Sequence, residues 1–374
     1  MKTDGIGIYI HIPFCVSKCA YCDFCSFPSR SLDVGKREAY IDALLVEIDS
    51  YKGLGLSADT VFIGGGTPSL LKPRELLKIR EHIDNSFTLA QDAEFTMEVN
   101  PKTGLGDNIS AYRAAGVNRI SIGLQSIHQN ELNLLGRIHS YEDFLDTYNA
   151  ARSAGINNVN VDLMYGIPEQ TAQSFEQTLS AVLSLNPQHI SLYGLILEEN
   201  TPFFDIKDSL PLPSEEGECD MYYFAARRLS DAGYNHYEIS NYAKPGLECK
   251  HNLKYWQCKE YIGLGLSAHS YFNGTRFANT NLLEDYITKR NVRIKSDRLT
   301  QEDARFEYAM LHLRLFDGFS VSEYKRLFDE DFLLPRRELL EQLSNGGYLN
   351  LEGDRISLTE TGFYVSNYIL SELL

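Results

Sequence analysis

The sequence predicts an α/β protein, a partial (βα)6 barrel followed by a small C-terminal α+β domain. Short β-rich runs alternate with longer amphipathic stretches up to about residue 240, and the strand comes first in each pair. Several amphipathic stretches end at a glycine, as at Gly116, Gly155 and Gly233, where a residue free to take positive φ ends a helix. Such repeats indicate a parallel sheet with its functional side chains at the C-terminal ends of the strands.

Six strands are expected in this first part of the chain, with long helices between several of them. The expected strands are Ile6–His11, Thr60–Ile63, Glu94–Val99, Arg119–Leu124, Asn158–Met164 and His189–Ile196. The clearest helices are Arg37–Tyr51, Pro73–Asn85 and Tyr141–Ala154.

The chain is expected to divide into a barrel over residues 1–240, a connecting region over 241–299 and a C-terminal domain over 300–374. From about 200 to 300 the chain is richer in Pro, Gly and Asn, and we expect irregular structure around one helix, Ser214–Ala232. Three helical stretches, two short strands and a last helix from Glu360 then predict a winged-helix-like domain. Residues 300–374 hold 14 acidic and 7 basic residues, so this domain is expected to have a packing or partner role rather than to bind DNA.

Composition excludes several classes of protein. The chain has 374 residues, 43% of them hydrophobic, and a formal charge of -16. This charge repels phosphate backbones, so nucleic acid is not an expected partner. No apolar run approaches the ~20 residues of a membrane-spanning helix, and no secretory signal precedes the first strand, so we expect a cytoplasmic protein.

Four of the seven cysteines fall close together after the first expected strand. Cys15, Cys19 and Cys22 follow a Cys-x3-Cys-x2-Cys pattern, and Cys25 comes three residues later. Three thiolates in one loop can hold three corners of a 4Fe-4S cluster and leave the fourth iron open to a ligand. A structural zinc site that uses Cys25 as its fourth ligand is the alternative.

These cysteines belong to a set of motifs that resembles a known family. The set comprises Tyr9-Ile-His-Ile-Pro-Phe-Cys15, the cysteine triplet with Tyr21, Gly64-Gly-Gly-Thr-Pro68, and His251-Asn-x-x-Tyr255-Trp256. The chain resembles radical S-adenosylmethionine (SAM) proteins of the oxygen-independent coproporphyrinogen III oxidase-like superfamily, in its HemW-type heme chaperone branch. The resemblance runs over essentially the whole chain and implies a TIM-like radical SAM barrel.

The resemblance also implies which residues bind the cofactors. Cys15, Cys19 and Cys22 would hold the cluster, while Cys25 is not assigned as a ligand. SAM would bind along the strand ends, and its expected contacts are Tyr9, Tyr21, Gly65, Gly66, Thr67, Glu98, Gln125, Arg137, Asp162 and Ile196. Arg137 is expected to pair with the SAM carboxylate through two hydrogen bonds.

His251, Tyr255 and Trp256 are the candidates for heme contacts. An imidazole can ligate heme iron while flat side chains cover the macrocycle. The alternative is a core histidine with satisfied hydrogen bonds beside an aromatic cluster. His269 is the second candidate, and His11 is expected to be structural.

The resemblance implies a chaperone that binds a 4Fe-4S cluster, SAM and heme and hands heme to hemoproteins. Two alternatives remain: a coproporphyrinogen III dehydrogenase, and an iron–sulfur or zinc protein without a working SAM site. Dehydrogenases of the family carry a long extension before the first cysteine, and their fourth cysteine follows the third in a Cys-x-Cys arrangement. Here 14 residues precede Cys15, and the fourth cysteine, Cys25, follows Cys22 after two residues instead of one. An electron donor for the cluster, peripheral contact with membrane-bound hemoproteins and a homodimer are further expectations.

Overall fold

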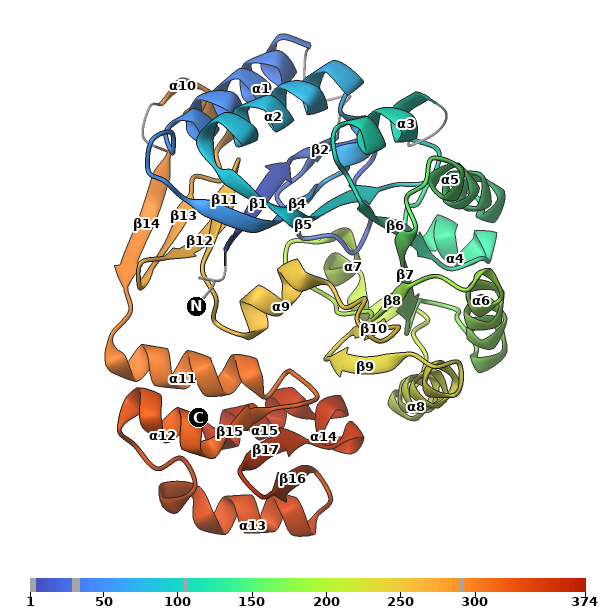
Figure 1. The fold of residues 1–374 in the computed structure, drawn as a ribbon. Helices are drawn as coiled ribbons and strands as arrows, with labels where there is room; N and C mark the ends of the chain where they lie inside the picture. Colours follow the sequence, from blue (N-terminus) through green and yellow to red (C-terminus); the bar gives the residue numbers. More distant parts are fainter. Residues whose placement is uncertain (1–4, 29–33, 104–106, 290–291) are drawn as a thin grey trace.

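The computed structural model describes residues 5–28, 34–103, 107–289 and 292–374. Its main element is a curved sheet of 12 strands in an open order, which confirms the partial barrel (Figure 1). The six expected strands lie side by side and parallel in this sheet. They are β1 (Ile6–Ile12), β4 (Ser57–Gly65), β5 (Thr88–Val99), β6 (Arg119–Gln125), β7 (Asn158–Tyr165) and β8 (His189–Gly194).

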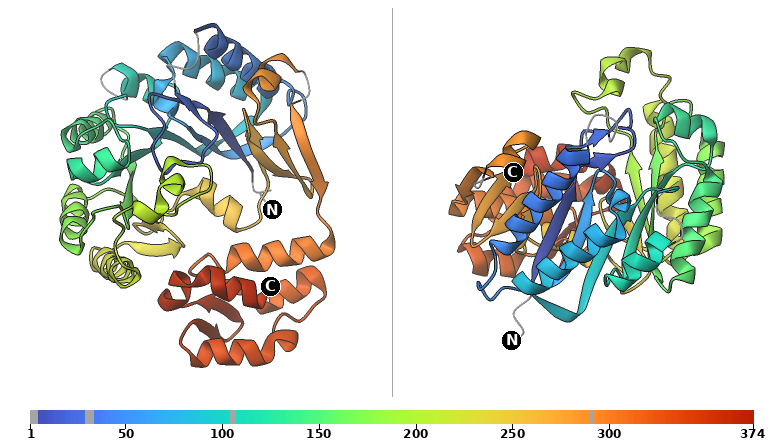
Figure 2. Two further views of the ribbon diagram at one scale, coloured as in Figure 1. Left: turned by 180° about the vertical axis from the view of Figure 1, so that it is seen from behind. Right: turned by 90° about the horizontal axis from the view of Figure 1, so that it is seen from above.

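Helices cover the convex face of this sheet (Figures 1 and 2). They are α1 (Val34–Asp49), α2 (Pro73–Ser86), α3 (Asp107–Ala114), α4 (Gln129–Leu134), α5 (Tyr141–Ser153), α6 (Ala172–Leu185) and α8 (Glu215–Asp231). Several begin at a capping residue, as at Ser140 and Thr171, whose hydroxyls accept hydrogen bonds from the first turn. The short α7 (Pro202–Asp205) follows β8.

The alternation of side chains along each strand separates an apolar from a polar face. On β6, Ile120, Ile122 and Leu124 are buried in the main hydrophobic core. The intervening Arg119 and Ser121 line a pocket on the concave side, as do Gly123 and Gln125. The same strands therefore build both the core and the candidate site.

The expectation of irregular chain around a single helix from about 200 to 299 is wrong. This stretch adds strands to both ends of the main sheet: β9 (Asn235–Glu238), β10 (Asn241–Ala243), β11 (Tyr261–Leu264), β12 (His269–Phe272), β13 (Thr275–Asn279) and β14 (Arg293–Arg298). β11 pairs in parallel with β1, from the far end of the sequence. Strands of three to six residues carry too short a pattern to be recognised by periodicity, and the strands that join β10 and β11 to the barrel, β8 and β1, are distant in sequence.

Two further helices belong to this stretch, α9 (Lys250–Trp256) and α10 (Leu283–Thr288). α9 lies on the concave side of the sheet, against β4 (Figure 1). A two-stranded ladder, β2 (Phe14–Cys15) with β3 (Phe27–Pro28), closes the base of the cysteine loop. The division of the chain at residues 240 and 299 stays a prediction.

The C-terminal domain has its own hydrophobic core and the expected order of elements. It contains α11 (Gln301–His312), β15 (Phe319–Ser320), α12 (Val321–Phe328), α13 (Arg337–Asn345), β16 (Leu349–Glu352), β17 (Arg355–Leu358), α14 (Glu360–Tyr364) and α15 (Ser366–Leu373). The two-residue β15 was not expected, and it completes a three-stranded sheet with β17 and β16. Backbone hydrogen bonds from Ile239 to Arg314 (3.1 Å) and from Phe316 to Tyr237 (3.0 Å) join this domain to β9.

Across the described parts of the chain, every helix is too short or too polar to span a bilayer.

Candidate functional site

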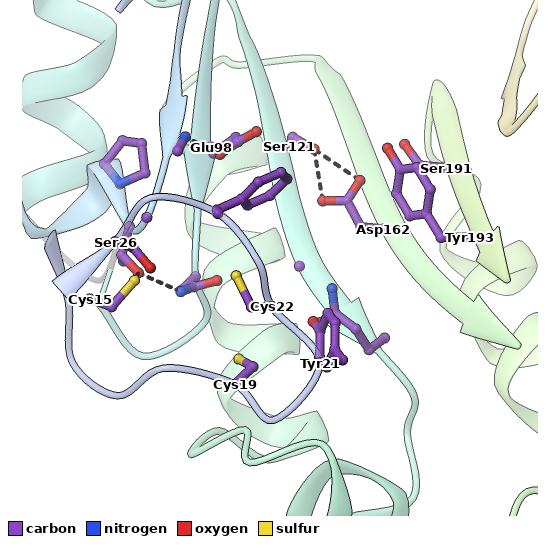
Figure 3. A pocket seen from close by; sticks show the side chains of 18 of the residues that line it. Cys15, Cys19, Tyr21, Cys22, Ser26, Glu98, Ser121, Asp162, Ser191 and Tyr193 are labelled. Atoms are coloured by element: carbon purple, nitrogen blue, oxygen red, sulfur yellow. Dashed lines mark hydrogen bonds between the residues drawn. The ribbon is translucent and has the colours of Figure 1, made fainter. Parts of the chain in front are cut away.

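One pocket of about 500 Å³ on the concave side of the sheet gathers the predicted site residues (Figure 3). They come from the cysteine loop, from the C-terminal ends of the parallel strands and from α9. Of the predicted cluster, SAM and heme residues, all but Trp256 line it: Tyr9, Cys15, Cys19, Tyr21, Cys22, Gly65, Gly66, Thr67, Glu98, Gln125, Arg137, Asp162, Ile196, His251 and Tyr255. Residues up to 246 positions apart therefore form one surface, as the expectation about strand ends requires.

Three cysteines of the loop face this pocket. Cys15 is buried, and Cys19 and Cys22 are half-buried. The loop is tied down by backbone hydrogen bonds at Ala20, whose N–H donates to Leu135 O (3.0 Å) and whose carbonyl accepts from Phe203 N–H (3.0 Å). Its thiols are already contacted by polar side chains from elsewhere. The Thr67 hydroxyl lies 3.7 Å from Cys15 Sγ, and Arg137 Nη1 lies 3.6 Å from Cys19 Sγ.

The cysteines are spread around the loop rather than gathered at a point. Among the described residues, no three His, Cys, Asp or Glu side chains lie close enough together to hold a single metal ion. A cubane cluster does not require such convergence, because each thiolate binds a separate iron.

Cys25 does not line the pocket; it lies against the main core, with Sγ 3.9 Å from Asn281 O. Its carbonyl accepts a hydrogen bond from His11 Nε2 (2.8 Å), and His11 Nδ1 lies 3.1 Å from the Tyr9 hydroxyl. His11 therefore joins the loop to β1, and its structural role stays a prediction.

The glycine run at the end of β4 brings the backbone close to the cysteine loop. Gly65 has φ +113°, and a Cβ there would come within 2.5 Å of the His11 ring. At Gly66 a Cβ would lie 2.7 Å from Phe14 O and 3.0 Å from Cys15 Sγ. Only glycine fits at either position, so the space beside Cys15 is bounded by bare backbone.

Two carboxylates, on β5 and on β7 with β6 between them, face the same space. Glu98 Oε2 accepts a hydrogen bond from Gly65 N–H (3.0 Å). Asp162 accepts from the Ser121 hydroxyl (2.9 Å) and from Asn160 Nδ2 (2.7 Å), as Figure 3 shows in part. Burial, followed by repulsion from Asp162, raises the pKa of Glu98 to about 8. A cationic ligand would favour the ionised form of both groups.

Gln125 and Arg137 present unused hydrogen-bonding atoms. Gln125 ends β6 with φ +64°, and its buried Oε1 has no partner among the described residues. Arg137 Nη2 donates to Gly123 O (2.7 Å) and to Asn100 Oδ1 (3.0 Å), while its Nε is buried without a partner. Buried polar atoms without a hydrogen-bond partner indicate that a ligand or water binds in the complete site.

Of the heme candidates, His251 and Tyr255 contact each other in the pocket, whereas Trp256 and His269 lie outside its lining. His251 is 1% exposed, and both of its ring nitrogens are engaged, Nδ1 with the Thr60 hydroxyl (2.8 Å) and Nε2 with the Tyr255 hydroxyl (2.8 Å). Burial, with Lys254 as the next cause, lowers the pKa of His251 to about 3, so the ring is neutral. Trp256 is half-buried outside the pocket lining, and His269 lies on β12 with an exposed side chain.

Sequence reasoning missed several polar residues of the pocket. Arg119, Ser121, Asn160, Ser191 and Tyr193 also line it. On β6, Arg119 and Ser121 lie an even number of residues before Gln125. On β7, Asn160 lies two residues before Asp162, and on β8, Ser191 and Tyr193 lie two residues apart. The period of two along a strand is the signal that could have found them.

Two family models match the chain: the Radical SAM superfamily over residues 9–182 and the HemN C-terminal domain over residues 299–365. The solved structure of coproporphyrinogen III oxidase (HemN) from Escherichia coli, described as a radical SAM enzyme, superposes with a TM-score of 0.85 at 24% identity and covers 99% of this chain and 90% of its own. Fold and cysteine loop thus define a radical SAM protein.

Similar proteins with curated names show to which family of radical SAM proteins the chain belongs. The heme chaperone HemW of Escherichia coli (strain K12) is 36% identical over 100% of this chain and 99% of its own. The heme chaperone HemW of Bacillus subtilis (strain 168) is 34% identical over 98% of each chain. The chain belongs to the HemW family.

Membership of the radical SAM superfamily implies a 4Fe-4S cluster and SAM. The residues present fit both groups. Three thiols face one pocket, bare glycine backbone bounds the space beside them, and Gln125 Oε1 is left without a partner there.

Proposed function

We propose that this protein is a heme chaperone, which holds a 4Fe-4S cluster on Cys15, Cys19 and Cys22, binds SAM beside it and transfers heme to hemoproteins. The observation that carries the proposal is the gathering of these residues in one pocket of a chain that matches proteins named heme chaperone along its whole length. The alternative, coproporphyrinogen III dehydrogenation, is supported by a likeness of fold at 24% identity.

The roles of this chain's residues in the proposal follow from their contacts. When bound, the cluster would supply an iron with a free coordination position. Arg137, which reaches Cys19 and carries an unpartnered Nε, would hold the SAM carboxylate. Glu98 and Asp162 would face the positive part of the ligand, and Gly65 and Gly66 would let it approach the backbone.

For heme we propose contact with α9, through His251 and Tyr255. Thr60 fixes Nδ1 of His251, and such an orienting partner is typical of histidines that bind metal through the other nitrogen. Ligation through Nε2 would require the Tyr255 hydroxyl to release it. Trp256 stays a candidate for the outer face of α9.

The proposal includes partners that no contact in the structure tests. Hemoproteins would receive the heme, and an electron donor would reduce the cluster. A cytoplasmic location, homodimerisation and peripheral contact with membrane-bound hemoproteins stay predictions. The relatives, which are named heme chaperones, support the delivery of heme to hemoproteins and none of the other partners.

The test is anaerobic reconstitution of the cluster, followed by parallel assays with hemin, with a heme-free acceptor protein and with coproporphyrinogen III. We expect hemin binding and transfer to the acceptor, and no decarboxylated porphyrinogen in the presence of SAM and a reductant. Decarboxylated product at catalytic yield would establish the dehydrogenase instead. His251→Ala should weaken hemin binding, and comparison with Trp256→Ala tells whether heme uses the pocket side or the outer side of α9.

A further inference from the structure

A chain of buried hydrogen bonds runs from the start of α9 to the pocket carboxylate Asp162. Cys249 N–H donates to the Tyr237 hydroxyl (3.3 Å), which lies 2.8 Å from His189 Nε2. His189 Nδ1 lies 2.6 Å from Asn160 Oδ1, and Asn160 Nδ2 donates to Asp162 Oδ1 (2.7 Å). The five residues come from α9's N-cap and from β9, β8 and β7.

The direction of every bond in this chain is fixed. A backbone N–H can only donate, so the Tyr237 oxygen accepts from Cys249 and its own proton is available for His189. Burial, with Arg119 as the second cause, lowers the pKa of His189 well below its usual value, so the ring is neutral and carries one proton. Because Asn160 Oδ1 can only accept, that proton is on Nδ1, and Nε2 accepts from Tyr237.

The other end of this series of hydrogen bonds, at Asp162, gives the same tautomer for His189. Asn160 Nδ2 also lies within hydrogen-bond distance of the Ser121 and Ser191 hydroxyls, at 2.7 and 2.9 Å. Reversal of the Asn160 amide would turn its oxygen toward the Asp162 carboxylate, which is unfavourable. Both ends therefore select one tautomer of His189 and one orientation of Asn160.

We infer that His189 and Tyr237 are positioning residues, which lock the Asn160 amide so that it donates to Asp162. Neither His189 nor Tyr237 lines the pocket, so neither would touch a ligand there. The inference rests on the proposed role of Asp162 in SAM binding. It adds that the helix carrying the His-Asn-x-x-Tyr-Trp motif is joined to the SAM pocket by oriented hydrogen bonds.

Removal of one remote hydroxyl should disturb the pocket. In Tyr237→Phe, nothing donates to His189 Nε2, and the proton can move to that nitrogen. Nδ1 would then accept from a reversed Asn160 amide, whose oxygen would face Asp162. Phenylalanine keeps the ring and its packing, so the fold should be retained.

The first measurement is the tautomer of His189, from ¹⁵N NMR of histidine-labelled protein after anaerobic reconstitution. We expect Nδ1–H in the parent and a mixture of both tautomers in Tyr237→Phe. Nε2–H in the parent would overturn the inference. This readout needs no SAM, so it tests the chain of hydrogen bonds independently of the proposed function.

The second measurement is SAM affinity by isothermal titration calorimetry under anaerobic conditions. Tyr237→Phe should bind SAM roughly three- to tenfold more weakly, in the range of one buried hydrogen bond. Tyr234→Phe is the matched control. The buried Tyr234 hydroxyl donates to Pro187 O (2.6 Å) and takes no part in this series of hydrogen bonds, so the variant should bind SAM as the parent does.

A double substitution separates the possible outcomes. In an Asp162→Asn background, Tyr237→Phe should have no further effect on SAM affinity, whereas additive effects would overturn a role through Asp162. If Asp162→Asn weakens SAM binding and Tyr237→Phe does not, the positioning role is wrong and the proposed SAM site stands. If Asp162→Asn binds SAM as the parent does, the proposed role of Asp162 in SAM binding is wrong, and the positioning role is wrong with it.

Discussion

The two faces of strands β5 to β8 show how one set of residues supports both the fold and the site. On the outer face, Ile122 and Val161 are fully buried against the helices. On the inner face, Ser121 and Asp162 alternate with them along the same strands and line the pocket. The outer face is held by apolar burial, and the inner face by hydrogen bonds with fixed donors and acceptors.

The difference predicts how substitutions should act. Loss of volume on the outer face should lower the free energy of unfolding and leave the ligand-binding groups in place. Loss of a polar group on the inner face should affect ligands strongly, because the remaining groups are oriented by one another. The predictions below test this separation, in order of decreasing effect.

The largest effect is expected at the cysteine loop, where Cys19→Ala should abolish the cluster. Each thiolate would hold one iron, and no other thiol among the described residues lines the pocket beyond Cys15 and Cys22. Iron and sulfide analysis after anaerobic reconstitution should fall from about four of each per chain to background. Cys25→Ala is the control, and it should keep the full content. Stoichiometric zinc without sulfide in the parent would contradict the assignment.

On the outer face, Ile122→Ala should cost about 2–5 kcal/mol in the free energy of unfolding, measured with urea. Ile122 is 0% exposed in the main core, so the substitution leaves a cavity between β6 and the helices. Cluster content at low temperature should be unchanged in the folded protein. A loss of cluster without loss of stability would show that the two faces are not separable.

In the pocket that the inner face lines, Arg137→Ala should weaken SAM binding by ~1.5–3 kcal/mol, the range of a hydrogen bond to a charged group. The cluster should remain, because Arg137 touches Cys19 without being a ligand. Arg80→Ala is a suitable control, since Arg80 pairs with Asp84 on α2 away from the pocket. SAM affinity equal to that of the parent would give Arg137 a structural role only.

The parts of the site that sequence could predict are those held in short motifs. The cysteine triplet and the Gly64–Pro68 run each lie within a few residues, so spacing alone places them in one loop or turn. The strand ends follow from the strand–helix repeats, and Glu98, Gln125 and Asp162 do lie at or near them. The strand pattern thus placed these three side chains near the strand ends, while their assignment as SAM contacts came from the family resemblance.

The parts that sequence could not predict depend on distant contacts. The pairing of β11 with β1 joins residues about 254 positions apart, for example Gly7 with Tyr261. The engagement of His251 Nδ1 depends on Thr60, which lies on β4, 191 positions away. Hydrogen-bond partners of this kind are set by the packing of α9 against the sheet, which no periodic pattern encodes.

The smallest effect is expected from pH. Burial and the nearby Asp162 raise the pKa of Glu98 to about 8, so this carboxyl is mainly protonated below that pH. A cationic ligand such as SAM favours the ionised form, so binding should release a proton below pH 8, and affinity should rise from pH 6.5 to 8 and level off above.

The rise should be a few-fold and no more than about tenfold per pH unit, because one proton is involved. Two groups favour the ionised form of Glu98, and neither changes over this range. Arg119, which lowers the pKa of Glu98, stays charged, and the Gly65 N–H that donates to Glu98 does not titrate. Glu98→Gln removes the titrating group, so its SAM affinity should lose this slope. S-adenosylhomocysteine, whose sulfur is uncharged, should show a weaker dependence on pH in the parent. A slope retained in Glu98→Gln would assign the proton to another group of the inner face, with Asp162 the next carboxyl to substitute.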